Sequence, residues 1–209
     1  MNAPALILID IQIGFQDVGY WGEQRNNPEA ELRASELLNI WRDNQFPVFH
    51  VQHCSSNPAS LLHESHAGNQ FNPLVTPIDG EPVIKKRVNS AFIGTDLQSQ
   101  LDDAKITTLI IAGLTTDHCI STSTRMAGNL GYRTFLVADA TATFNRRGID
   151  GQNFPAELVH QTALASLDKE FATVVKSDVI HQSLASDAAD KIKIFIRDKR
   201  NICLPERDN

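Results

Sequence analysis

The chain has 209 residues, of which 42% are hydrophobic and 21% are charged, and its formal net charge at pH 7 is −6. These values are typical of a single globular domain, and we expect one domain over residues 1–209, with a core over 5–190 and a tail at 191–209. An acidic chain lacks the basic surface that phosphates require, and the apolar run near the N-terminus is too short to span a bilayer. We therefore expect neither a nucleic-acid partner nor a membrane partner.

The cysteine content indicates reduced thiols. The chain contains three cysteines, Cys54, Cys119 and Cys203, an odd and sparse set that does not form a disulfide framework. The first ten residues carry no basic segment and run directly into an acid, so they do not read as a signal peptide. These features predict a cytoplasmic location.

The first half of the chain alternates strand and helix patterns. Residues 6–11 are an apolar run closed by Asp10, which predicts a strand buried on both faces, and residues 28–45 have the spacing of an amphipathic helix. Residues 47–52 and 82–85 are predicted strands. The polar segment 55–80 between them is longer than an ordinary connection, which is typical of a functional loop.

The second half repeats this alternation. A helix over residues 94–101, capped around Thr95, precedes a strand over 107–112 and a helix that begins around Cys119 and ends at Gly131. Then follow a strand at 134–139, a helix at 155–167, a strand at 171–175 and a helix at 178–190. Residues 191–197 fit either a strand or a continuation of the last helix. The order predicts an α/β fold, a three-layer sandwich around a mainly parallel, Rossmann-like six-stranded sheet.

Three chemically useful residues follow three of the predicted strands. Asp10, the Lys85–Lys86 pair and Cys119 lie at or just past the carboxyl ends of strands, where ligands bind in sheets of this kind. A thiol in the first turn of a helix has a lowered pKa, and the free N–H groups there can hold an oxyanion. A lysine would further favour the thiolate, and a carboxylate could take the thiol proton and pass it to a leaving amine. Taken singly, each residue also fits a structural role: a packing cysteine, a solvated lysine and a loop-capping acid.

Three motifs carry a family resemblance. They are Leu-Ile-Asp-Ile-Gln-Ile-Gly-Phe at residues 8–15, Val-Ile-Lys-Lys-Arg-Val-Asn-Ser-Ala-Phe-Ile-Gly-Thr-Asp-Leu at 83–97, and Ile-Ala-Gly-Leu-Thr-Thr-Asp-His-Cys at 111–119. In these motifs the chain resembles the isochorismatase-like cysteine hydrolases, a superfamily that includes nicotinamidases, N-carbamoylsarcosine amidase and ureidoacrylate or biuret amidohydrolases.

The resemblance implies a catalytic triad of Asp10, Lys86 and Cys119. Lys86 is preferred to Lys85 because the family places its lysine four residues before the Ser-Ala-Phe element, which stands here at residues 90–92. The resemblance also implies a cis peptide bond between Leu114 and Thr115, and an oxyanion hole formed by the backbone N–H groups of Thr115 and Cys119.

The substrate pocket and any metal site are less defined. The expected pocket residues are Gln12, Phe15, Trp21 and His118, with Gln12 as a support rather than a catalyst. Tyr20 and the 55–80 loop are further candidates for the pocket wall. Nicotinamidases of the superfamily carry an Asp-x-His metal motif, whereas the corresponding stretch here has no acid two residues before a histidine. We therefore expect no metal and no cofactor, while a site built from His50, His53, His63 and His66 stays open.

These features predict a cysteine hydrolase that cleaves a small amide or ureido C–N bond through a thioester. The alternatives are a vinyl-ether-cleaving isochorismatase or a nicotinamidase on the same fold, and a catalytically inactive binding protein. The resemblance also implies a homo-oligomer, either a dimer or a tetramer.

Overall fold

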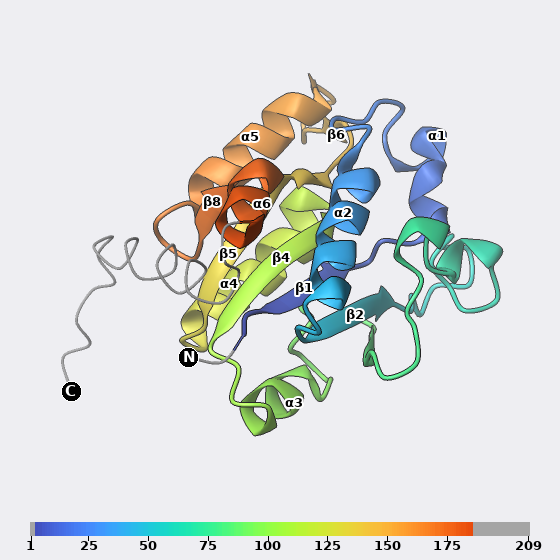
Figure 1. Cartoon of the computed structure of the whole chain (residues 1–209). Helices are drawn as coiled ribbons and strands as arrows, with labels where there is room; N and C mark the ends of the chain where they lie inside the picture. The colour runs from blue at the N-terminus through green and yellow to red at the C-terminus, as the bar shows by residue number, and fades with distance from the viewer. Residues whose placement is uncertain (1–2, 186–209) are drawn as a thin grey trace.

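The computed structural model describes residues 3–185, and a six-stranded parallel sheet lies at its centre. The strand order is β3-β2-β1-β4-β5-β8, with every neighbouring pair parallel (Figure 1). The predicted α/β class and six-stranded parallel sheet are therefore confirmed. The strands are β1 (Ala5–Ile9), β2 (Val48–His53), β3 (Val83–Lys86), β4 (Thr108–Leu114), β5 (Arg133–Ala142) and β8 (Thr173–Val175).

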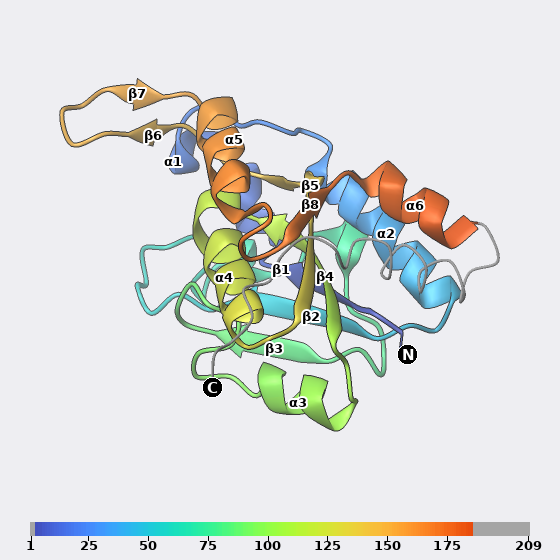
Figure 2. The same ribbon diagram turned by 90° about the vertical axis from the view of Figure 1, so that its left-hand side faces the viewer.

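Helices cover both faces of the sheet (Figure 2). Alternate side chains of a strand point to opposite faces, so Leu6 and Leu8 of β1 pack with one layer while Ile7 and Ile9 pack with the other. The first layer consists of α2 (Ala30–Asp43) and α6 (Ser177–Ala185). The second consists of α3 (Leu97–Asp103), α4 (Ser121–Asn129) and α5 (Ala156–Leu167).

Several short elements were not predicted. A two-stranded hairpin, β6 (Arg146–Arg147) and β7 (Asn153–Phe154), projects from the body of the molecule (Figure 2). A one-turn helix, α1 (Val18–Trp21), follows β1. Such elements are shorter than the window over which hydrophobic periodicity can be recognised.

One predicted helix start is wrong, and one predicted helix end is not tested. The predicted cap near Thr95 is wrong, because α3 begins at Leu97 after Asp96, which makes no side-chain capping bond, while the Thr95 hydroxyl donates to Ala91 O. The predicted end of the last helix, residues 186–190, and the tail 191–209 lie outside the described residues. No helix within residues 3–185 is long and apolar enough to cross a membrane.

The ends of β1 and β4 approach each other closely. Gly113 has a φ of +132°, and a Cβ there would lie 2.0 Å from Ile9 O, so only glycine fits. Strand order reverses at this point, since β2 lies on one side of β1 and β4 on the other. In open α/β sheets this reversal forms the crevice where ligands bind.

Candidate active site

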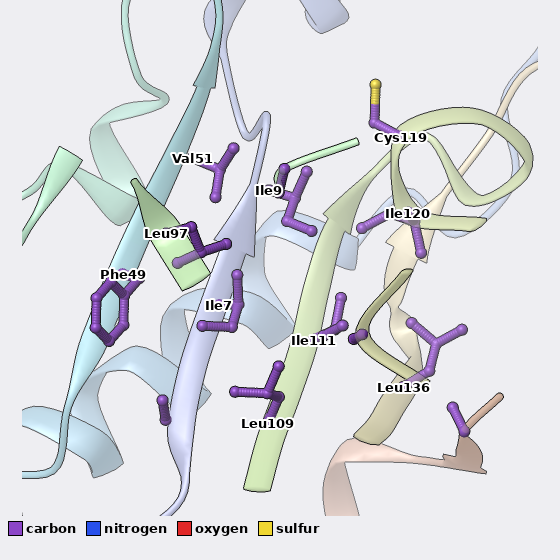
Figure 3. Packing of buried hydrophobic residues seen from close by; sticks show 14 of the residues in the cluster. Ile7, Ile9, Phe49, Val51, Leu97, Leu109, Ile111, Cys119, Ile120 and Leu136 are labelled. Carbon is purple, nitrogen blue, oxygen red and sulfur yellow. The ribbon is translucent and has the colours of Figure 1, made fainter. Parts of the chain in front are cut away.

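Three neighbouring parts of the sheet edge supply Asp10, Lys86 and Cys119. Asp10 follows β1 with a φ of 54°, Lys86 is the last residue of β3, and Cys119 lies in a π-helical turn, η4 (Thr116–Ile120), after β4. Figure 3 shows the Cys119 sulfur beyond the end of β4, pointing away from Ile120 and the rest of the hydrophobic core. Lysine is long enough to reach past the end of β2 toward β1, so all three side chains meet.

The ammonium of Lys86 is the centre of this group. Its Nζ lies 2.7 Å from Asp10 Oδ2 and 3.3 Å from Cys119 Sγ. It also lies 3.0 Å from His53 Nδ1 and 3.2 Å from the carbonyl oxygen of Val88. Asp10 and Lys86 are almost fully buried, with 0% and 1% exposure, and Cys119 is 8% exposed. The structure thus brings together the three residues that the sequence selected.

Burial and a neighbouring carboxylate oppose ionisation of the Cys119 thiol. Burial and the Asp10 carboxylate raise the pKa of Cys119 well above its ordinary value, and Lys86 only partly offsets them. Burial opposes the charge of Lys86, but Asp10 and Cys119 outweigh it and raise the pKa of that ammonium. The lowered thiol pKa expected from a helix start is therefore wrong for the resting site, because Cys119 is buried beside a carboxylate.

Asp10 has one carboxylate oxygen available. Oδ2 accepts from Lys86, while the buried Oδ1 has no hydrogen-bond partner within the part of the chain that the structure describes. A carboxylate oxygen of Asp10 lies within 4.8 Å of the Cys119 sulfur. An unpartnered buried acceptor next to a thiol is placed to receive the thiol proton.

A cation does not fit among these residues. One group of potential metal ligands occurs within residues 3–185, namely Asp10, His53 and Cys119, whose ligand atoms lie within 4.8 Å of one another. The Lys86 ammonium contacts all three, so a positive charge already stands at their centre. A metal ion there would be repelled by that charge and would compete for the same lone pairs.

The four histidines considered as metal ligands have separate partners. His50 lies 2.7 Å from Glu81 Oε2 on a buried part of β2. His63 Nδ1 lies 2.8 Å from Ser65 Oγ, and His66 Nε2 lies 2.9 Å from Pro58 O. His53 alone faces the triad, through Lys86.

Gln12 supports the backbone next to the triad. Its Nε2 donates to Asn69 O at 2.7 Å and to His53 O at 3.1 Å, and its Oε1 accepts from the His53 N–H at 2.9 Å. The side chain is thus fully engaged with backbone groups.

The turn between β4 and η4 carries a second polar cluster. The Leu114–Thr115 peptide bond is cis. Arg146 Nε donates to Asp117 Oδ2 at 2.7 Å, and another nitrogen of Arg146 donates to Thr115 Oγ1 at 3.4 Å. The sequence did not single out Arg146, because the hairpin that carries it has no recognisable motif.

The other expected pocket residues lie around this turn. The rings of Phe15 and Trp21 stack with centroids 4.6 Å apart, and Phe15 packs in a cluster that includes Leu114. Phe15 is 3% exposed, so its contacts are those of a packed residue. His118 is largely exposed, with Nε2 lying 3.4 Å from Asp117 Oδ2.

Comparisons with known proteins agree with this architecture. Residues 4–179 match the family model of the isochorismatase domain. The chain is 46% identical over 174 residues to an uncharacterized isochorismatase family protein, YrdC, of Bacillus subtilis, covering 83% of this chain and 92% of the relative. It is also 27% identical over 194 residues to maleamate amidohydrolase of Pseudomonas putida, covering 86% of each chain.

A solved structure gives the same result. The crystal structure of a putative hydrolase of the isochorismatase family from Chromobacterium violaceum superimposes with a TM-score of 0.84, at 38% identity, over 88% of this chain and 95% of the other. The protein therefore belongs to the isochorismatase family of hydrolases.

Proposed function

We propose that the protein is a cysteine hydrolase that cleaves a C–N bond of a small amide or ureido compound through a thioester. The observation that carries this proposal is the position of Lys86 Nζ, 2.7 Å from the carboxylate of Asp10 and 3.3 Å from the sulfur of Cys119. An acid, a cation and a thiol in one buried cluster form a nucleophile–base–orienter set. The similarity to an amidohydrolase supports the choice of bond.

The reaction begins from the neutral thiol. Asp10 takes the proton of Cys119 as the sulfur attacks the substrate carbonyl carbon, so a C–S bond forms and the carbonyl electron pair moves onto oxygen. The backbone N–H groups of Thr115 and Cys119 receive this oxyanion. The Lys86 ammonium stabilises negative charge on either partner, and the net charge of the cluster does not change because the proton stays within it.

The tetrahedral adduct then collapses to products. Its C–N bond breaks, and Asp10 returns the proton to the departing nitrogen, which leaves as ammonia or an amine. The resulting thioester is attacked by water, from which Asp10 removes a proton, and the C–S bond breaks to release the acid. The proton returns to the sulfur and restores the resting site.

The substrate would lie over the turn that carries the thiol. We place Trp21 and His118 at its edge, because Trp21 packs against the cluster of Phe15 and Leu114 and His118 is exposed next to Cys119. Phe15 shapes the site from beneath through its contacts with Trp21, and Gln12 acts through the backbone that it holds.

A substrate panel tests the proposal. Small primary amides, ureido acids and carbamoyl amino acids are incubated with the wild type and with Cys119→Ala, and release of ammonia or amine is measured. We expect turnover by the wild type and a loss of at least about a thousandfold in Cys119→Ala. Cys54→Ala is the matched control, since Cys54 is a second buried thiol outside the cluster.

The same variants separate the alternatives. Turnover that survives in Cys119→Ala would contradict a thioester mechanism, and cleavage of a vinyl ether by that variant would favour isochorismatase chemistry. Mass spectrometry of the quenched wild type gives a direct test, because an acyl adduct on the peptide containing Cys119 is expected.

A further inference from the structure

The loop after β3 presents an exposed amide next to the candidate nucleophile. Oδ1 of Asn89 lies 3.8 Å from Cys119 Sγ, a hydrogen-bond contact to sulfur. Asp10 and Lys86 face the same sulfur but are only 0% and 1% exposed, whereas Asn89 is exposed. Of these three neighbours of the sulfur, Asn89 alone reaches solvent, so it marks the side from which a substrate approaches.

Buried groups fix the backbone on both sides of Asn89. The carbonyl of Val88 accepts from Lys86 Nζ at 3.2 Å. The fully buried hydroxyl of Ser123 donates to the Asn89 carbonyl at 3.4 Å and accepts from the Ala91 N–H at 3.0 Å. These contacts use backbone atoms of the loop, so a change of the Asn89 side chain leaves them in place. The position of this amide beside the sulfur is therefore set by the fold.

The Asn89 side chain has unused hydrogen-bonding capacity. A carboxamide oxygen has two acceptor sites, and the NH2 group has two donors. Within residues 3–185, the one hydrogen-bond contact of this side chain is that with the sulfur of Cys119. When the thiol proton moves to Asp10, Oδ1 has no remaining donor on the protein and can accept one from a substrate.

Cleavage of a C–N bond requires an oriented nitrogen. The nitrogen of the tetrahedral adduct departs only when its lone pair takes a proton, which the proposed mechanism supplies from Asp10. That lone pair must face Asp10, so the N–H bonds of the same nitrogen point elsewhere. An N–H bond taken out of water needs an acceptor. Asn89 Oδ1 is such an acceptor on the exposed side of the sulfur, while Asp10 lies on the buried side.

We propose that Asn89 is a further catalytic residue, whose Oδ1 accepts an N–H of the departing nitrogen and so turns its lone pair toward Asp10; this inference rests on the proposed function. When the C–N bond breaks, its electron pair stays on nitrogen, which has taken the proton from Asp10, and the oxyanion pair re-forms the carbonyl. Asn89 exchanges no proton. The preferred substrates are therefore amides or ureido compounds whose departing nitrogen carries hydrogen.

Amides and esters with the same acyl group isolate this step. The probes are maleamate with monomethyl maleate, nicotinamide with methyl nicotinate, and N-carbamoylglycine with N-(methoxycarbonyl)glycine. Release of ammonia is measured for the first member of each pair and release of methanol for the second. Both members leave the same acyl group on Cys119, but the methoxy oxygen has no hydrogen to donate. Since kcat/KM reports the steps through acylation, the amide-to-ester ratio of kcat/KM reports the departing group.

Two variants separate the acceptor from the shape of the side chain. Asn89→Leu removes the acceptor at similar size, and its kcat/KM for the amide should fall about tenfold while that for the ester stays within about twofold. Asn89→Asp keeps an acceptor oxygen, and its added charge should slow both members alike by disfavouring the thiolate, so the ratio should stay within about threefold of the wild type. Gln98→Leu, which replaces an exposed amide on α3, is the control and should change neither rate.

Equal losses for the amide and its ester in Asn89→Leu would overturn the inference, because the effect would then lie in the nucleophile or the fold. An unchanged amide rate in Asn89→Leu, or an amide-to-ester ratio lowered to the same extent in both Asn89 variants, would also reject it. Each of these results would leave the proposed function standing, since the wild type would still cleave the amide through Cys119. If the wild type cleaves neither member of any pair, the proposed function and the inference fail together.

Discussion

The side chain of Gln12 holds both backbone hydrogen-bonding groups of His53. Its Oε1 accepts from the His53 N–H at 2.9 Å, and its Nε2 donates to the His53 carbonyl at 3.1 Å. This clamp joins the segment after β1 to the end of β2. The clamp therefore fixes the position from which the His53 imidazole contacts Lys86. Gln12 is only two residues after Asp10 in the sequence, but its side chain contacts the backbone of His53 and Asn69.

Replacing Gln12 by glutamate should damage this clamp. The donor is lost, and a carboxylate is placed against the carbonyl oxygens of His53 and Asn69, so we expect a loss of about 1–3 kcal/mol in the free energy of unfolding. Urea unfolding measures the change. Gln16→Glu is the control, because Gln16 is exposed in the same segment. Equal losses in the two variants would contradict the role given to the buried amide.

The ion pair of Lys86 and Asp10 should show strong coupling in stability. Both side chains are completely buried, so Lys86→Met leaves an unpaired carboxylate and should destabilise the protein by about 3–5 kcal/mol. The double variant Asp10→Asn with Lys86→Met removes both charges and should recover much of that loss, although it should be inactive. The free energy of unfolding is measured for the full double-mutant cycle. Additive losses would show that the pair does not act as a unit.

The sequence predicts the six main strands because they are apolar runs buried on one or both faces. The runs at residues 6–11 and 107–112 show this well, since every residue of β1 and β4 is buried. The convergence of Asp10 and Cys119 also follows from sequence, because parallel strands end at the same edge of a sheet. The selection of Lys86 over Lys85 depended on the family motif, and the structure shows why it matters: Lys86 is buried in the cluster, whereas Lys85 is exposed and pairs with Glu64.

Other parts of the site depend on contacts that a sequence does not display. The direction of the Cys119 pKa shift follows from burial and from Asp10, which is distant in sequence, so the helix-start argument alone gave the wrong sign. His53 appeared only as a possible metal ligand, although its place at the end of a predicted strand was a signal that it faces the same edge. Arg146 lies on a hairpin too short to predict, so its contacts with Thr115 and Asp117 had no signal in the sequence.

A partly buried cluster formed by Arg42, His50 and Glu81 should make stability depend on pH. Burial favours the neutral form of Glu81, but Arg42, the Ile78 N–H and His50 outweigh it and lower the pKa of Glu81 from 4.5 to about 2. Burial lowers the pKa of His50, although Glu81 opposes this shift. A group with a depressed folded-state pKa stabilises the fold above its unfolded value, and that contribution is lost as pH falls.

Stability should therefore fall as the pH drops from about 4.5 toward about 2, with His50 adding a loss that begins below its ordinary value of 6.5. Glu81→Gln should be less stable than the wild type at pH 7, and the difference should narrow as the pH falls, because a protonated glutamate resembles glutamine. Urea midpoints measured across this range provide the test, with Asp79→Asn as an exposed control. A difference that stays constant with pH would show that the Glu81 charge does not contribute.

The close approach of β1 and β4 predicts an unequal response of two glycines to alanine. In Gly113→Ala, the new Cβ would lie 2.0 Å from Ile9 O and 2.8 Å from two further backbone atoms of that residue, so the strands must separate. Gly131 also has a positive φ, of +88°, but nothing lies within 4 Å of a Cβ there, so Gly131→Ala should cost only about 1–2 kcal/mol of backbone strain.

We expect Gly113→Ala to be insoluble, or to unfold at a far lower urea concentration than Gly131→Ala. Any folded fraction should lose activity, because Gly113 stands immediately before the turn that places Thr115 and Cys119. A Gly113→Ala protein as stable as Gly131→Ala would mean that the two strands can part without cost, and the geometry proposed for the oxyanion turn would then lose its support.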